Sequence, residues 1–451
     1  MIESREEVYY GIWFLPKAEI KLQGRLTVSE TFIDLHLTDP EHYSFINNDS
    51  LDLQKLPIIY GLGQHREFIT LYDCSGYGGD FSANLMLYGD RHFADIETLK
   101  FRMMRVNLPY FDKWINPGSF KKEVLKNGFV IKYENPQKID FELNNEFKLN
   151  VDFDCFIPDT HDKTKIVLNE YSLIQLISNN QDGSLLTNFL KNLTYLQQLV
   201  SFLFRDGANI DTIRVYLTPE DYSKNRYMGI MVFGLHPFNK YAHMEYGLHP
   251  LIKYTTLKER LEPFVQSWFA FANDAQHIIN LILQDYFYKG VFNENRFLNL
   301  IRVLEIYHAF KFPGNKLPQE EFKEKLDTII ENIPDQYKTE VRDYLTYSNE
   351  YTLDMRLRAL IVEVKGNQIG LDYKLDDEFI KSVKWSRNYY THYNPLAEKK
   401  ALKGEALIKL TETCRALTNF LILKHLGVSD ETLAETFKYY FEHSYYSNYF
   451  L

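Results

Sequence analysis

The spacing of hydrophobic residues along the chain changes near residue 261. Before that point apolar and polar side chains alternate in short runs, most clearly in Phe147–Cys155, where every second residue is apolar. A period of two is typical of β-strands with one buried face. After residue 261 the apolar residues recur every three or four positions, which predicts amphipathic helices. The pattern predicts an α+β fold: a β-rich N-terminal domain, an antiparallel sheet or sandwich, followed by an all-α bundle.

Three segments of the N-terminal region predict how its strands connect. Residues 139–143 and 147–155 both alternate and are joined through two asparagines, which predicts a β-hairpin. Apolar runs at 212–217 and 230–233 are expected to be closing strands of the sheet. The glycine-rich run 74–80 has no phosphate-loop lysine and leads into no helical pattern. We therefore expect a turn there, and not a nucleotide-binding loop.

The helices are placed by apolar stripes and by the residues that flank them. Ser184 stands just before the stripe Leu186–Leu203 and is expected to cap that helix. Asn394 precedes Pro395 and is expected to cap another, with proline at its first position. In the C-terminal region the predicted helices are 262–288, 294–311, 319–332, 335–347, 353–364, 376–392, 402–426 and 429–443.

The same change of period sets the expected domain boundaries. A chain of 451 residues is too long for one ordinary core, and its 45% hydrophobic and 25% charged residues are globular values. We expect a β-rich domain over 1–235, a connection over 236–260 and a helical domain over 261–451. The β-rich domain is expected to sense or to regulate.

Composition narrows the chemistry further. Cys74, Cys155 and Cys414 are far apart and form no CxxC pair, which predicts reduced thiols and no zinc site. No close cluster of metal-ligating residues occurs, so neither a metal nor another cofactor is expected. The first residues lack the blocks of a signal peptide, and no apolar stretch approaches 18 residues. We expect a soluble, cytoplasmic protein without a membrane partner.

The segment 384–395 carries the strongest candidate chemistry. Arg387, Asn388 and His392 stand just before Pro395, which cannot continue a helix. RNA brings its own nucleophile, the 2′-hydroxyl, so its cleavage needs a group that moves protons near neutral pH and a fixed cation. Histidine supplies the first and arginine the second. These residue types therefore predict a ribonuclease site that works without metal.

Spacing alone leaves an alternative open. A surface arginine and a histidine near a helix end would give the same pattern by chance. Residues five apart on an ideal helix diverge by about 140°, so either a helix break after His392 or a second copy of the motif would be needed for Arg387 and His392 to cooperate. The looser pair Arg302 and His308 lies in an apolar-periodic run, and we interpret it as packing.

The net charge of −10 argues against a general nucleic-acid coat. The residues around the motif, however, carry an excess of positive charge, which an RNA phosphate would favour. The segment from Phe379 to Leu410 contains seven basic and two acidic residues, a local excess of five positive charges. A solvated helix face is the simpler explanation of such a run. The motif nevertheless lies in a basic island of an acidic chain.

In its context, Arg387-Asn388-x-x-x-His392 resembles the R-(N/D/H)-x3-H signature of HEPN ribonucleases. The N-terminal half adds a diffuse pattern of glycines and aromatic residues, which includes Gly11–Pro16, Gly24–Leu26, Gly61–Gly63, Phe68–Cys74 and Trp114. Together these features resemble the ApeA-like anti-phage proteins, in which a β-rich domain precedes a HEPN domain. The resemblance covers nearly the whole chain.

The resemblance implies a metal-independent endoribonuclease that acts in anti-phage defence by abortive infection. RNA, with tRNA as one candidate, would be the substrate, and a phage-encoded protein would be the trigger. Arg387 would stabilise the phosphorane, His392 would act as general acid or base, and Asn388 would position the phosphate or the motif. HEPN relatives pair through the helical domain, so a homodimer is expected, and Glu305 is the expected supporting residue on an earlier helix.

Two other function classes remain open. The first is a sensor that dimerises through its helical domain and binds a nucleotide or RNA without cutting it. The second, a carbohydrate-processing enzyme suggested by the aromatic-rich β-domain, ranks last because the sequence offers no convincing pair of carboxylates.

Overall fold

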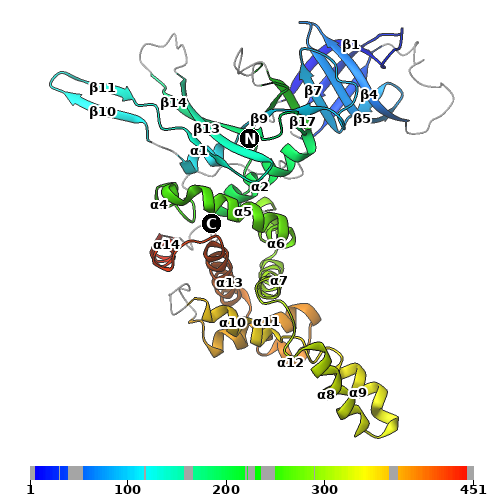
Figure 1. Ribbon diagram of the computed structural model, residues 1–451, viewed down its shortest axis with the longest axis vertical. Coiled ribbons are helices and arrows are strands. Elements are labelled where there is room, and N and C mark those ends of the chain that lie inside the picture. Colours follow the sequence, from blue (N-terminus) through cyan, green and yellow to red (C-terminus); the bar gives the residue numbers. More distant parts are fainter. Residues whose placement is uncertain are drawn as a thin grey trace. The chain divides into compact units, whose positions relative to one another are not determined.

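The computed structural model describes residues 6–29, 31–38, 54–115, 118–156, 166–218, 221, 229–234, 249–288, 290–364 and 374–443. The chain forms two compact units, Met1–Phe269 and Ala270–Leu451 (Figure 1). The first is built mainly from β-strands and the second from helices. The predicted α+β class is therefore confirmed. Much of the expected connection, residues 235–248, lies outside the described residues.

The first unit is organised by one antiparallel sheet. In the described residues its order is β12-β13-β14-β9-β16-β17-β7-β5-β4-β1-β2-β3-β6. Because β6 pairs with β5 as well as with β3, strands β1 to β6 close into a ring. The strands of this sheet are β1 (Glu7–Phe14), β2 (Leu22–Val28), β3 (Ile33–Leu37), β4 (Gln54–Gly63), β5 (Phe68–Tyr77), β6 (Asp80–Ser82), β7 (Leu85–Gly89), β9 (Met103–Asn107), β12 (Ile139–Glu142), β13 (Phe147–Phe156), β14 (Asn169–Ser178), β16 (Thr212–Tyr216) and β17 (Ile230–Gly234).

Trp13 forms the centre of the ring. Its side chain is fully buried among aliphatic residues of β2 to β5. Two glycines of the neighbouring strands make room for it: a Cβ on Gly61 would collide with the indole, and one on Gly24 would lie 2.9 Å from it. Within the glycine and aromatic pattern of the N-terminal half, Trp13, Gly24 and Gly61 are thus a packing requirement of this ring.

The predicted hairpin and turn are confirmed. Strands β12 and β13 pair antiparallel, and the side-chain oxygen of Asn144 accepts hydrogen bonds from the amides of Glu146 and Phe147, each at 2.9 Å. The glycine-rich run ends in the tight β5–β6 turn, where Gly78 and Gly79 have φ of 58° and 92°. A left-handed backbone favours glycine at these two positions. The run therefore turns the chain, as expected.

The prediction that Ser184 caps a helix is wrong. Helix α2 (Leu186–Phe204) has Leu185 as its N-cap, with no side-chain cap bond. Ser184 belongs to β15 (Ser184–Leu185), which pairs with β8 (Lys100–Phe101), and its hydroxyl lies 2.7 Å from that of Ser178. Pairing with another strand competed with the local capping preference of serine. The unit also contains α1 (Pro109–Ile115), α4 (Tyr254–Leu257) and the two-stranded hairpin β10 (Phe120–Leu125) and β11 (Gly128–Tyr133).

The helical pattern of the C-terminal region is confirmed with two corrections. The predicted helix 262–288 is interrupted at Ala275, a residue type that favours helices, so nothing in the sequence marks the break. Residues 335–337 form a 3-10 turn before the helix that follows. The helices are α5 (Leu261–Asp274), α6 (Gln276–Phe287), α7 (Asn293–Lys311), α8 (Gln319–Glu331), α9 (Lys338–Leu345), α10 (Leu353–Val362), α11 (Asp377–His392), α12 (Pro395–Glu398), α13 (Gly404–His425) and α14 (Asp430–His443).

Helix α7 lies at the centre of the second unit. It packs against α6, α10, α11 and α13, and the buried hydroxyl of Tyr307 donates to the carbonyl of Leu421 on α13 at 3.1 Å. Phe297, Leu300 and Leu304 are also buried on α7. This core holds α11, the helix that carries the candidate motif.

Candidate functional site

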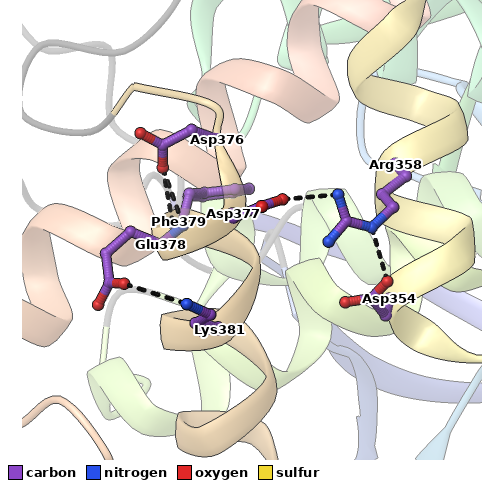
Figure 2. Close-up of polar contacts among 7 residues, drawn as sticks. All are labelled: Asp354, Arg358, Asp376, Asp377, Glu378, Phe379 and Lys381. Atoms are coloured by element: carbon purple, nitrogen blue, oxygen red, sulfur yellow. Dashed lines mark hydrogen bonds and ion pairs between the residues drawn. The ribbon is translucent and has the colours of Figure 1, made fainter.

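Helix α11 is fixed at its start by charged contacts (Figure 2). The carboxylate of Asp376 accepts hydrogen bonds from the amides of Glu378 and Phe379, at 3.0 and 3.2 Å. Arg358 of α10 reaches Asp377 at 2.6 Å and Asp354 on its own helix at 2.7 Å. These contacts cap the helix and join it to α10.

The other end of α11 coincides with the end of the motif. His392 is its last residue, and Tyr393 follows in a left-handed conformation, with φ of 48°. The side chain of Asn394 then accepts the amide of Leu396 at 2.8 Å and caps α12, with Pro395 at the first helical position. Both the helix end after His392 and the Asn394 cap are confirmed. The helix remains regular from Arg387 to His392, so its end does not bring the two side chains together.

The motif residues lie on one accessible side of α11. At 100° per residue, Arg387 and His392 are about 140° apart, and Asn388 lies between them. His392 is exposed, whereas Arg387 and Asn388 are half-buried. Among the described residues, no carboxylate pairs with Arg387 and no side chain hydrogen bonds to the imidazole of His392. Both groups are therefore available to an incoming phosphate.

Two residues next to the motif hold the following loop against α11. The hydroxyl of Ser386, which is fully buried, accepts the amide of Leu402 at 3.0 Å. The hydroxyl of Tyr390, one turn further, donates to the carbonyl of the same residue at 2.9 Å. Burial and the nearby carboxylate of Glu294 raise the pKa of this phenol, so it stays a donor at neutral pH. We call this pair of bonds the Leu402 clasp.

Cation–π contacts reinforce the Leu402 clasp. The ammonium of Lys400 lies 4.2 Å from the ring centre of Trp385, and that of Lys403 lies 5.1 Å from the ring centre of Tyr389. Lys403 also pairs with Glu398 at 2.9 Å. Part of the basic island is therefore used to fix the loop, which leaves Lys384, Arg387 and Lys399 as exposed or half-exposed cations without a carboxylate partner among the described residues.

Glu305, the expected supporting residue, lies on α7 and not on the helix that carries the motif. Its backbone carbonyl accepts from Arg356 of α10 at 3.0 Å, at the level where α10 meets the start of α11. The end of α11 instead lies beside Glu294. Eleven residues of helix separate Glu294 from Glu305, which corresponds to about 16 Å. Arg387, Asn388 and His392 thus lie within about 140° of one another around α11, and among the described residues no hydrogen bond or ion pair joins Glu305 to any of them.

Of the second Arg and His pair, the histidine packs as predicted, whereas the arginine does not. His308 is 2% exposed and lies between the rings of Phe312 and Tyr351, at centroid distances of 5.1 and 5.2 Å. Burial and the nearby guanidinium of Arg356 lower the pKa of His308. Arg302 is exposed on the same helix.

The described residues show neither a metal cluster nor a helix that could span a membrane. They contain no group of three or more His, Cys, Asp or Glu side chains that could hold a metal ion. Within that same part of the chain, no helix combines the length and the apolar character that crossing a membrane requires.

Comparison with known proteins agrees with this architecture. The helical unit is of the HEPN class: the family model described as Apea-like HEPN matches residues 298–432, which include the whole motif. The model described as ApeA N-terminal domain 1 matches residues 8–268, more than half of the chain. The chain therefore belongs to the ApeA family, and this membership supports a role as a HEPN effector in anti-phage defence. No curated protein and no solved structure matches the chain significantly.

The Leu402 clasp was not predicted. Ser386 and Tyr390 are four residues apart and alternate with the motif residues along α11. A polar i,i+4 pair on the buried side of a helix was the available signal. Its target, the backbone of a loop that follows the helix, can be found only from the fold.

Proposed function

We propose that this protein is a metal-independent endoribonuclease of anti-phage defence, with Arg387, Asn388 and His392 as its catalytic residues. The observation that carries the proposal is the motif itself: an arginine and a histidine without partners in the described residues, at the end of a helix in a domain of the HEPN class. Cleavage of host RNA, with tRNA as one candidate, would cause abortive infection after a phage-encoded protein triggers the enzyme.

The chemistry assigned to each group follows from its charge and position. His392 would take the proton of the RNA 2′-hydroxyl or give one to the leaving 5′-oxygen, because imidazole exchanges protons near neutral pH. Arg387 would stabilise the charge that builds on the phosphoryl oxygens. Asn388, between them on the helix face, would hold the phosphate in line. Glu305, on α7, is the proposed supporting residue and takes no catalytic step of its own.

The active species would be a homodimer in which two copies of α11 face each other. One helix places its Arg387 and His392 about 140° apart, so a single protomer offers a sparse site. A twofold axis beside α11 would put the arginine of one protomer opposite the histidine of its partner, and it would create two equivalent sites. HEPN domains often dimerise, which supports a dimer here.

The test is RNA cleavage by the purified full-length protein, with and without a co-expressed phage protein as activator, in the presence of EDTA. The proposal predicts cleavage that survives EDTA and leaves 2′,3′-cyclic phosphate and 5′-hydroxyl ends. A strict requirement for Mg²⁺ or Mn²⁺ would contradict the mechanism. Binding of RNA without cleavage under every activating condition would instead favour the sensor alternative.

A further inference from the structure

The helices α8 and α9 form an arm that leaves the rest of the second unit. The two helices lie side by side and extend away from the other helices (Figure 1), joined by an ion pair of 3.0 Å between Arg342 and Asp327. Only Ile330 is buried on α8, and no residue of α9 is buried. We define the arm as residues 319–345. With 13 residues, α8 alone extends about 20 Å.

The root of the arm is closed by its own hydrogen bonds. The amide side chain of Asn349, which is 5% exposed, accepts from the backbone of Leu317 at 2.9 Å and donates to it at 3.0 Å. Lys316 donates through its backbone to the carbonyl of Asn349, at 3.0 Å, and through its ammonium to the carbonyl of Ser348, at 2.7 Å. The arm is therefore a defined extension with a fixed base, and not a loose connection.

The arm and its root expose aromatic and aliphatic side chains of the kind that protein interfaces bury, among many charged ones. Tyr344 is 76% exposed and Tyr347, next to the root, is 72% exposed, and Tyr337 and Ile329 are exposed as well. Tyrosine is enriched at such interfaces because its large ring is only partly polar. Helices that bury so little of their own apolar surface gain their stability from a partner.

The charge of the arm indicates what kind of partner it can bind. Residues 319–345 contain eight carboxylates and four cations, a net charge of −4, and Glu324 and Glu331 are seven residues apart and so share a face of α8. A surface of this sign repels RNA and anionic membranes. The same unit carries the opposite charge around the motif, where residues 379–410 have seven cations against two carboxylates, a net charge of +5.

Part of that basic region is both unpaired and flanked by exposed apolar side chains. Lys384 and Lys399 have no carboxylate partner among the described residues, and Tyr393 and Leu396 are 72% and 77% exposed. We call these four residues the basic platform. Lys384 lies on the same side of α11 as the motif, between Arg387 and Asn388 in angle, and the other three residues follow the end of the helix. The charge and the apolar residues of the basic platform complement those of the arm.

We propose that the arm of one protomer docks on the basic platform of a second copy of this chain. In a twofold dimer each chain gives one arm and receives one, so the contact is made twice. The arms would hold the two α11 helices in register. The inference rests on the dimer of the proposed function, and it identifies the surfaces that build it.

A charge exchange on the full-length protein tests the pairing. The arm variant is Glu324→Lys with Glu331→Lys, the platform variant is Lys384→Glu with Lys399→Glu, and the control is Glu97→Lys with Asp182→Lys. The control residues are exposed in the first unit and have no side-chain partner among the described residues. Sedimentation velocity at micromolar concentration in low salt measures the dimer. Each of the first two variants should raise its dissociation constant roughly tenfold or more, because like charges then meet.

Mixing the arm variant with the platform variant should restore the dimer. In that heterodimer each arm again meets a platform of opposite charge, whereas each variant alone stays monomeric. The control variant and the variants Arg387→Ala and His392→Ala should dimerise as the wild type does. The measured dissociation constant of the dimer therefore does not depend on whether the protein cleaves RNA. A wild-type protein that is monomeric, an arm variant that dimerises normally, or a mixture that stays monomeric would each overturn the proposal.

A deletion provides a second measurement. Replacing residues 319–346 by two glycines keeps the root, because Leu317 and Asn349 already lie within hydrogen-bond distance. This variant should keep the helical signal of the remaining bundle in circular dichroism and should sediment as a monomer. A deleted protein that remains a dimer of unchanged affinity would show that the interface lies elsewhere.

Discussion

Helices α7 and α11 both carry an arginine followed by a histidine, and the bundle treats the two pairs in opposite ways. On α7 the imidazole of His308 is buried between aromatic rings, whereas on α11 His392 is exposed at the last turn. On α7 the histidine lies in the buried stripe while Arg302 is exposed, and the α11 pair lies on a polar and basic helix face. The neighbours of such a pair, and not its spacing, decide whether it packs or is available for chemistry.

The largest effect is expected on RNA cleavage. Arg387→Ala and His392→Ala should each lower the cleavage rate by about a thousandfold or more, because each removes a group that acts in the transition state. The double variant should be little worse than either single one, since the two groups act as a unit. Arg302→Ala is the matched control, and cleavage by it should equal the wild type in the same gel assay. A His392→Ala protein that cuts RNA at the wild-type rate would show that the site is assigned wrongly.

For the free energy of unfolding we expect the larger effect from the histidine of α7 and the smaller one from the histidine of α11. His308→Ala leaves a cavity between Phe312 and Tyr351 and should lower the free energy of unfolding by roughly 2–3 kcal/mol. His392→Ala changes an exposed side chain and should alter it by less than about 0.5 kcal/mol. Urea unfolding followed by circular dichroism measures both. Equal losses for the two variants would remove the distinction between the helices.

The Leu402 clasp links the fold to the site and should give an intermediate effect. Ser386→Ala leaves the amide of Leu402 without its acceptor at a half-buried position, at a cost of about 1 kcal/mol in stability. Because α11 and the following loop would then shift, kcat should fall more than KM changes. Tyr390→Phe removes the other bond and should give the same pattern more weakly. Unchanged kinetics in both variants would limit the clasp to stability.

A smaller effect is expected on the pH dependence of stability. The pKa of His308 is lowered in the folded state by burial and by Arg356, so below about pH 6.5 the unfolded chain binds a proton that the folded chain does not. Stability should therefore fall as the pH is lowered from 7.5 to 5.5. His308→Gln should reduce this slope but not abolish it, because burial also lowers the pKa of His425. His392→Gln is the control, and thermal midpoints across this pH range would show whether the two differ.

Much of the fold and part of the site could be predicted from local patterns. The α11 helix end after His392 and the Asn394 cap follow from a proline and an asparagine at fixed positions. The β12–β13 hairpin follows from alternation on both sides of two asparagines. In these cases the residues that determine the structure are neighbours in the sequence.

The features that could not be predicted depend on distant contacts. Ser184 pairs with another strand, Ala275 interrupts a continuous apolar stripe, and Ser386 binds a loop sixteen residues away. The predicted helices 319–332 and 335–347 gave no sign that together they form an exposed arm. Glu305 was selected by its helix, and the bond between its backbone carbonyl and Arg356 of α10 is seen only in the fold.

If Arg387 of one protomer acts with His392 of its partner, two variants that are inactive alone should complement each other in a mixed dimer. Arg387→Ala and His392→Ala proteins, each inactive alone, are mixed, allowed to exchange subunits and assayed with RNA in EDTA. Half of the resulting dimers contain both variants, and each of these has one intact composite site out of two, so about a quarter of the wild-type activity should return. A mixture that exchanges subunits and remains inactive would contradict the shared site.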